Sequence, residues 1–197
     1  MSLISNIRNV LSDTDYRISY QVFSLARKFN GNLKSYFKFL EWSCHGVPWI
    51  LFVTILVYTS SSYKFFTKLL AGLIFDIVYV AIGKAFFRRR RPNYAPQDDQ
   101  MVMVGVDKMS FPSGHASRAI YVALLMSDYW FCSFFYLWAG LVSVSRVAYG
   151  RHFIGDVIGG ALLGYLNWAT QSTLFYPVNS LMEYFIMKVL ASPRDEF

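Results

Sequence analysis

The chain is poor in charged residues and in cysteine. Charged side chains make up only 16% of its 197 residues, and Cys44 and Cys132 are its two thiols. A disulfide framework of the kind that stabilises small secreted proteins is therefore not expected. Both cysteines lie beside or within apolar stretches, so we predict that they are buried and reduced. The start MSLISNIRNV lacks the apolar core of a signal peptide, which predicts a retained N-terminus.

Hydrophobic residues dominate the composition. They make up 55% of the sequence and aromatic residues 19%, far from the average of soluble proteins. With no repeat or linker to divide the chain, this composition predicts one all-α, multi-pass transmembrane helical bundle of about five or six membrane helices. We expect an N-terminal amphipathic segment over 1–41, a transmembrane domain over 42–192 and a C-terminal tail over 193–197.

The apolar runs set the expected membrane spans, which are 42–63, 65–87, 114–128, 129–147 and one within 157–182 that breaks near Pro177. A sixth helix over 178–192 either spans the membrane or lies in its interface. With the N-terminus in the cytosol, every Lys and Arg except Lys64 and Lys68 falls on the cytosolic side of this arrangement, as retained positive charge should. Before the first span, Ile18, Val22, Leu25 and Phe29 recur at helical spacing. That pattern is typical of a helix in the membrane interface or of one packed on the bundle.

Three short polar segments interrupt the apolar sequence. They are Lys84-(six residues)-Arg91-Pro92, Pro112-Ser113-Gly114-His115, and Ser145-Arg146-(five residues)-His152-(three residues)-Asp156. A phosphoryl group in transfer spreads negative charge over its oxygens, so a metal-free site needs fixed cations, a nucleophile, a group that orients it and an acid for the leaving oxygen. The three segments together contain all of these residue types. They predict a membrane phosphatase with its site on the cytosolic face.

The third segment has the clearest geometry. His152 and Asp156 are four residues apart, so on a helix they share one face. Asp156 can then accept a hydrogen bond from one ring nitrogen of His152 and leave the other free to attack phosphorus. Taken alone, such a pair more often braces a contact between helices. The neighbouring Ser145-Arg146 favours the catalytic interpretation.

The other two segments supply binding groups and an acid. Ser113 can cap the helix that follows it, and Gly114 lets backbone N–H groups approach an anion closely. His115, in the first turn, is placed to protonate a leaving oxygen. Lys84 and Arg91 lie two helical turns apart, so both can reach one pocket if the helix continues as far as Arg91.

Other charged residues allow two interpretations. Arg88 to Arg90 are typical of a topogenic or lipid-headgroup patch. Arg118 faces either the site or the headgroups. Asp76, inside an expected span, is either a hydrogen-bonded interior carboxyl or part of a proton relay, and the lack of a second ionisable group in the apolar spans favours the former.

Together the three segments resemble the motifs of the type 2 phosphatidic acid phosphatase (PAP2) superfamily, in order and with its spacing. The stretches LEWSCHGVPW, GKAFFRRRRP, DKMSFPSGHASRA and SRVAYGRHFIGDV resemble its presqualene diphosphate phosphatase branch, also called type 6 phospholipid phosphatase. The superfamily resemblance implies the PAP2 and haloperoxidase helical fold and a phosphohistidine intermediate. By the same resemblance Lys84, Arg91, Arg146, Ser113 and Gly114 hold the phosphate, His152 attacks, Asp156 orients it and His115 protonates the leaving group.

The narrower resemblance implies hydrolysis of isoprenoid diphosphates such as presqualene, farnesyl or geranylgeranyl diphosphate at the endoplasmic reticulum and nuclear envelope. No cofactor, Mg²⁺ or other metal, and no nucleic acid, is expected; the partners are the lipid phosphate or diphosphate substrate and membrane lipids. One alternative is a broad phosphatase of phosphatidate, lysophosphatidate and sphingosine phosphate. Another is a catalytically silent membrane scaffold, against which the intact His115, His152 and Asp156 argue. The sequence does not predict an oligomeric state.

Overall fold

The computed structural model describes residues 3–29, 33–95 and 108–171, together with residues 180, 181, 184, 185 and 188. Within these ranges the chain forms helices with the bounds α1 (Leu3–Lys28), α2 (Leu33–Ser43), α3 (Gly46–Thr59), α4 (Tyr63–Phe87), α5 (Gly114–Leu125), α6 (Cys132–Ala148) and α7 (Ile154–Gln171). The one β-type pairing in the described part of the chain is an isolated bridge between Arg90 and Met109. The prediction of an all-α fold is confirmed.

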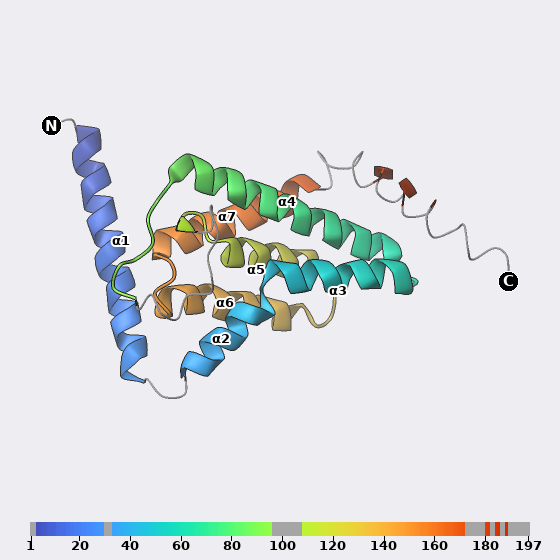
Figure 1. Ribbon diagram of the computed structural model, residues 1–197, viewed down its shortest axis with the longest axis horizontal. Coiled ribbons are helices and arrows are strands. Elements are labelled where there is room, and N and C mark those ends of the chain that lie inside the picture. The colour runs from blue at the N-terminus through green and yellow to red at the C-terminus, as the bar shows by residue number, and fades with distance from the viewer. Residues whose placement is uncertain are drawn as a thin grey trace.

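Helices α3 to α7 run along the long axis of the molecule, and α1 lies across one end of them (Figure 1). Helix α5 is central, because it packs against α4, α6 and α7, while α3 packs against α4 and α2 against α6. Apolar side chains of α3, α4 and α5 form the larger core cluster, with Tyr121 as its largest fully buried side chain. The core therefore lies along α5 and away from the end that α1 covers.

Two glycines let α7 touch the backbone of α5. A Cβ on Gly160 would lie 2.3 Å from the carbonyl oxygen of Ser113, and one on Gly164 would lie 2.2 Å from that of Ser117. No other residue fits so short an approach. The Ser113 N–H also donates to the carbonyl oxygen of Asp156 at 3.0 Å. This contact holds the second and third polar segments beside each other.

The expected spans agree with the helices except at the first. Helix α4 is long and apolar enough to cross a membrane by itself, and α6 is a shorter apolar helix. Helices α2 and α3 are long and apolar enough only when taken together, as a pair bent by 46°. The predicted continuous span over 42–63 is therefore wrong. The break lies at Cys44 and His45, where the guanidinium of Arg118 donates to the carbonyl oxygen of Cys44 at 2.9 Å and replaces a helical hydrogen bond.

Helix α1 does not use its predicted apolar stripe to pack. Ile18, Leu25 and Phe29 are exposed, whereas Ser19 and Phe23 on another face are buried. The stripe thus remains available to a membrane interface while the helix is docked on the bundle. The thiols also differ from expectation, because Cys44 is buried but Cys132 is only partly so, and both are free. Apart from five single positions, the sixth predicted helix over 178–192 lies outside the described residues.

Candidate active site

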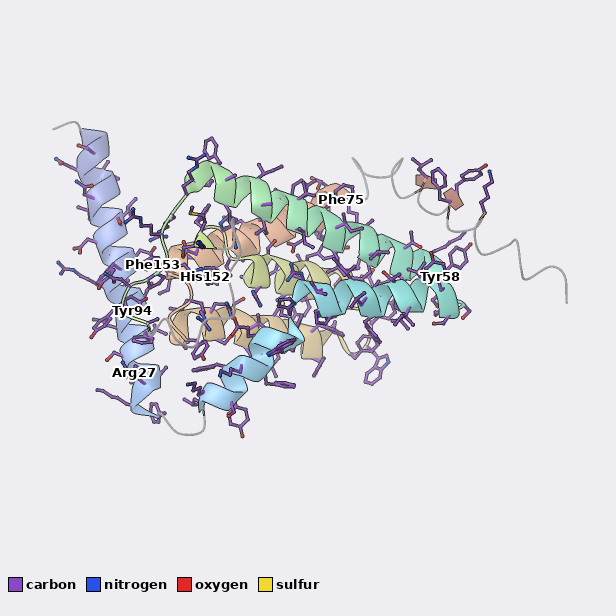
Figure 2. The ribbon with its side chains drawn as sticks, in the orientation of Figure 1. Arg27, Tyr58, Phe75, Tyr94, His152 and Phe153 are labelled. Carbon is purple, nitrogen blue, oxygen red and sulfur yellow. The ribbon has the colours of Figure 1, made fainter. Side chains whose placement is uncertain are left out.

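The three polar segments meet at the end of the bundle that α1 crosses. Helix α4 ends there, α5 and α7 begin there, and α6 ends there (Figure 1). Figure 2 shows His152 and Phe153 at this end with Tyr94 between them and α1, while Tyr58 lies at the opposite end. The three segments, which are separated in the sequence, therefore form one cluster in space.

His152 is held by one ring nitrogen. Its Nδ1 lies 2.8 Å from the carbonyl oxygen of Ser110, and the side chain is 2% exposed. A carbonyl oxygen only accepts hydrogen bonds, so Nδ1 carries the proton and Nε2 keeps its lone pair. The carboxylate of Asp156 is farther from Nδ1, at 3.7 Å, beyond hydrogen-bond distance. Ser110, which sequence reasoning did not single out, therefore sets the tautomer of His152.

Burial determines the charge of His152. It lowers the pKa of the imidazole from 6.5 to about 3, and the nearby guanidinium groups of Arg91 and Arg146 lower it as well, while Asp156 opposes them. The ring is therefore neutral at pH 7. A neutral imidazole with a free Nε2 is the form that can act as a nucleophile.

Asp156 sits at the start of α7 among three donors. Its Oδ2 accepts from the Phe153 backbone N–H at 2.8 Å and from the Ser110 hydroxyl. Its Oδ1 accepts from the Arg89 guanidinium at 2.8 Å. Because Ser110 contacts both Asp156 and His152, the carboxylate positions the imidazole through Ser110 as well as through its own charge.

The second segment begins α5 as the sequence predicts. The Ser113 side chain caps the helix by accepting from the Ala116 N–H at 3.5 Å. His115 follows in the first turn, and its Nε2–H donates to the carbonyl oxygen of Glu41 at 3.2 Å. Its own carbonyl oxygen accepts from the Cys44 thiol. The ring lies close enough to Arg146 and His152 to interact with both electrostatically.

The three predicted phosphate-binding cations end in the same region. Lys84 and Arg146 are buried, and the Arg91 guanidinium donates to the carbonyl oxygen of Arg151 at 3.4 Å, next to His152. Gly83, beside Lys84, packs against Pro112, which brings the end of α4 onto the second segment. Among the residues that the structure describes, no group of three or more His, Cys, Asp or Glu side chains is arranged to hold a metal ion.

Glu41 of α2 is a charged neighbour of the site that sequence reasoning missed. Its carboxylate lies 3.1 Å from the Arg146 guanidinium and 3.9 Å from that of Arg151. Together with the contact between its carbonyl oxygen and His115, this places α2 beside the phosphate-binding side of the cluster. One signal was available, because Glu41 is the acidic residue directly before a long uncharged run.

The arginine run does not behave as one patch. Arg88 and Arg90 are exposed, as a headgroup patch requires, but Arg89 turns inward. Its guanidinium bridges Asp156 and Asp15 at 2.8 and 2.7 Å and lies over the Phe153 ring at 4.3 Å. The interpretation of Arg89 as a headgroup residue is therefore wrong, because two carboxylates from distant parts of the chain compensate its charge.

The structure also places the two residues that the sequence left open. Arg118 points into the bundle, where its guanidinium lies 3.2 Å from the Asp76 carboxylate. The Ser117 hydroxyl donates to the same carboxylate. Asp76 is thus an ion-paired interior carboxyl, and Arg118 is buried, with its guanidinium on Asp76 and on the carbonyl oxygen of Cys44.

Comparison with known proteins agrees with this geometry. The profile of the PAP2 superfamily matches residues 65–179. A probable lipid phosphate phosphatase beta of Arabidopsis thaliana is 34% identical over 133 residues, covering 51% of this chain and 61% of that protein. A lipid A 4'-phosphatase of Porphyromonas gingivalis is 37% identical over 105 residues, covering 49% and 44%. Phosphatidylglycerophosphatase B of Bacillus subtilis is 31% identical over 131 residues, covering 57% and 62%.

Solved structures share the fold. The crystal structure of Aquifex aeolicus LpxE superposes with a TM-score of 0.59 and 24% identity, covering 76% of this chain and 92% of that one. A transmembrane PAP2-type phosphatidylglycerolphosphate phosphatase from Bacillus subtilis superposes with a TM-score of 0.61 and 22% identity, covering 92% and 88%. The predicted helical-bundle fold is thereby confirmed. The chain spans less than two thirds of the length of the three curated relatives that it matches.

Proposed function

Because the chain belongs to the PAP2 superfamily, we propose that it is an integral-membrane lipid phosphatase that works through a phosphohistidine on His152, without a metal ion. One observation carries the proposal most directly. The Nδ1–H of His152 donates to Ser110, which leaves a neutral Nε2 beside Arg91 and Arg146, the cations that a phosphoryl group requires. The relatives named above act on lipid phosphates, which supports the same class of substrate.

The proposed reaction has two steps. Nε2 of His152 attacks phosphorus, the bond from phosphorus to the leaving oxygen breaks, and His115 gives that oxygen a proton. A water molecule then attacks the phosphohistidine, returns a proton to His115 and releases phosphate. Lys84, Arg91 and Arg146, with the Ser113 hydroxyl and the Gly114 N–H, stabilise the charge on the equatorial oxygens.

More specifically, we propose that the substrate is an isoprenoid diphosphate, such as presqualene, farnesyl or geranylgeranyl diphosphate. We also propose that it is cleaved at the endoplasmic reticulum and nuclear envelope, from the cytosolic face. This assignment rests on the sequence resemblance described above. A broad phosphatase of phosphatidate, lysophosphatidate and sphingosine phosphate uses the same chemistry with another apolar tail. A substrate panel separates the two, because pockets for apolar tails discriminate by only about 1–3 kcal/mol per methylene-sized difference.

The test is phosphate release by purified protein in EDTA from farnesyl diphosphate, phosphatidate and sphingosine phosphate, beside His152→Ala. We expect activity in EDTA, highest with farnesyl diphosphate, and essentially none in the variant. Activity in His152→Ala would exclude a phosphohistidine, and loss of wild-type activity on chelation would restore a metal mechanism. If the folded wild-type protein released no phosphate from any of the three, a catalytically silent scaffold would replace the enzyme proposal.

A further inference from the structure

We propose that Asp15 and Arg89 are positioning residues for the active site, and that docked α1 is thereby a working part of it. Arg89 links the carboxylate of Asp15 on α1 to the carboxylate of Asp156 beside His152. The inference rests on the proposed function of His152 and Asp156. It adds a part of the chain that lies outside residues 65–179, the range that the family profile matches.

Both terminal nitrogens of Arg89 take part in this link. One terminal nitrogen donates to Asp156 Oδ1 at 2.8 Å and the other donates to Asp15 Oδ2 at 2.7 Å. The Asp156 side chain is 0% exposed, whereas those of Arg89 and Asp15 are 29% and 17% exposed. A charge-assisted pair in such a partly buried place is stronger than a surface pair, and it fixes the direction of the carboxylate as well as its charge.

Helix α1 also caps the helix that carries Asp156. The backbone N–H of Gly155 donates to Asp15 Oδ1 at 3.0 Å, and that of Ile154 donates to the Ser19 hydroxyl at 2.9 Å. The first N–H groups of a helix have no partner within the helix, and an acidic group there also suits the helix dipole. The first two N–H groups of α7 are thus satisfied by side chains from a helix that lies about 135 residues earlier in the sequence.

Apolar contacts hold α1 in the register that this requires. Phe23, two turns after Asp15, is 5% exposed and packs on Tyr94 with ring centroids 4.9 Å apart. Gly150, with φ +72°, gives room for the Phe23 ring, because a Cβ there would lie 3.1 Å from it. Asp15 therefore sits at a fixed place above the start of α7, and Figure 1 shows α1 crossing the bundle there.

A pocket reaches the Asp15–Arg89 pair from outside. Its volume is about 520 Å³, and Leu11, Ser12, Asp15, Phe87, Arg88, Arg89 and Phe111 line it. It is lined by residues of α1 and by Arg89, whose guanidinium contacts Asp156. A small cation in solution can therefore reach the place of the Arg89 guanidinium when that side chain is shortened.

Two variants and one control test the link. Asp15→Asn keeps the shape but removes the charge that Arg89 needs, and we expect kcat to fall about tenfold to a hundredfold with KM unchanged. Asp15→Glu should recover part of the loss. Asp13→Asn is the control, because Asp13 is exposed on the same helix and pairs with Arg17; it should behave as wild type.

Arg89→Ala adds a readout, recovery by a small cation, that a loss of α1 packing alone would not give. We expect a similar loss of kcat and partial recovery by added guanidinium at non-denaturing concentrations, but not by ammonium. Wild-type kcat in Asp15→Asn, or a loss in both variants that follows a lowered melting temperature without guanidinium recovery, would overturn the inference. His152→Ala is assayed alongside, since activity in that variant refutes the proposed function instead.

Discussion

Two buried carboxylates in this protein have nearly the same partners and different surroundings. Asp156 accepts from the Ser110 hydroxyl and pairs with Arg89 at 2.8 Å, while Asp76 accepts from the Ser117 hydroxyl and pairs with Arg118 at 3.2 Å. Both carboxylates are 0% exposed.

The Asp156 group lies at the end of the bundle, where its arginine is partly exposed and contacts α1. The Asp76 group lies inside α4 and α5, where its arginine is 9% exposed and also holds the backbone break at Cys44. The same three side-chain types therefore lie beside the proposed nucleophile in one place and join helices in the other. Because only the Asp156 group lies beside His152, we expect substitutions in it to lower kcat and substitutions in the Asp76 group to lower stability.

The largest expected effect is on chemistry, from Asp156→Asn. The substitution removes the negative charge beside His152 and leaves Arg89 with one carboxylate. We expect kcat to fall about a thousandfold, which is less than the roughly ten-thousandfold loss in a Ser-His-Asp triad, because the Ser110 carbonyl oxygen also holds the imidazole. Steady-state kinetics in detergent micelles measure this. A fall of less than tenfold would show that Ser110 alone positions the imidazole.

The next effect is on stability, from Arg118→Met. Removing one partner of a buried ion pair leaves the Asp76 charge uncompensated, which costs about 3–4 kcal/mol of unfolding free energy. The double variant Asp76→Leu with Arg118→Met removes both charges and should recover most of that loss. Thermal unfolding in micelles checks both, and kcat per folded molecule should fall less than tenfold. A double variant as unstable as the single one would contradict the ion-pair account.

The difference between the groups also explains what the sequence could predict. Helices α4 to α7 follow from apolar runs bounded by prolines and polar segments, and the three motifs lie at helix ends, so their convergence follows from local signals. Arg89 could not be separated from Arg88 and Arg90, because its direction depends on Asp15, 74 residues away. The break at Cys44 had a local signal that the span prediction did not use, because Pro48 has no N–H to donate to the Cys44 carbonyl oxygen four residues before it. What the sequence could not show is that Arg118, from another helix, donates to that oxygen instead.

A third difference appears on acidification, because His152 belongs only to the Asp156 group. Its pKa is about 3 in the folded protein and about 6.5 when unfolded, so between these values the unfolded state binds more protons. Protonation of His152 does not lower the free energy of unfolding above pH 6.5, and below that pH it lowers it by about 1.4 kcal/mol per pH unit. Thermal unfolding from pH 7 to 5 should be steeper in wild type than in His152→Gln. Parallel curves would mean that the imidazole is charged in the folded protein.

The smallest effect concerns a third carboxylate, Glu41, which pairs with Arg146 on the phosphate-binding side. Its carboxylate lies 3.1 Å from the Arg146 guanidinium, which we propose also binds the phosphate, so the two anions should compete for one cation. Glu41→Gln removes the competing charge, and we expect the inhibition constant of inorganic phosphate to fall about tenfold, or about 1.4 kcal/mol.

Asp128→Asn is the matched control for Glu41→Gln. It removes the same charge from an exposed turn between α5 and α6, so it should leave phosphate inhibition unchanged. The sign of the Glu41→Gln result separates two roles for this carboxylate. Tighter phosphate binding means that Glu41 yields its place on Arg146 to the substrate, as we expect because both anions need the same nitrogen. Weaker binding would mean that Glu41 instead holds Arg146 in position, as Asp15 is proposed to hold Arg89.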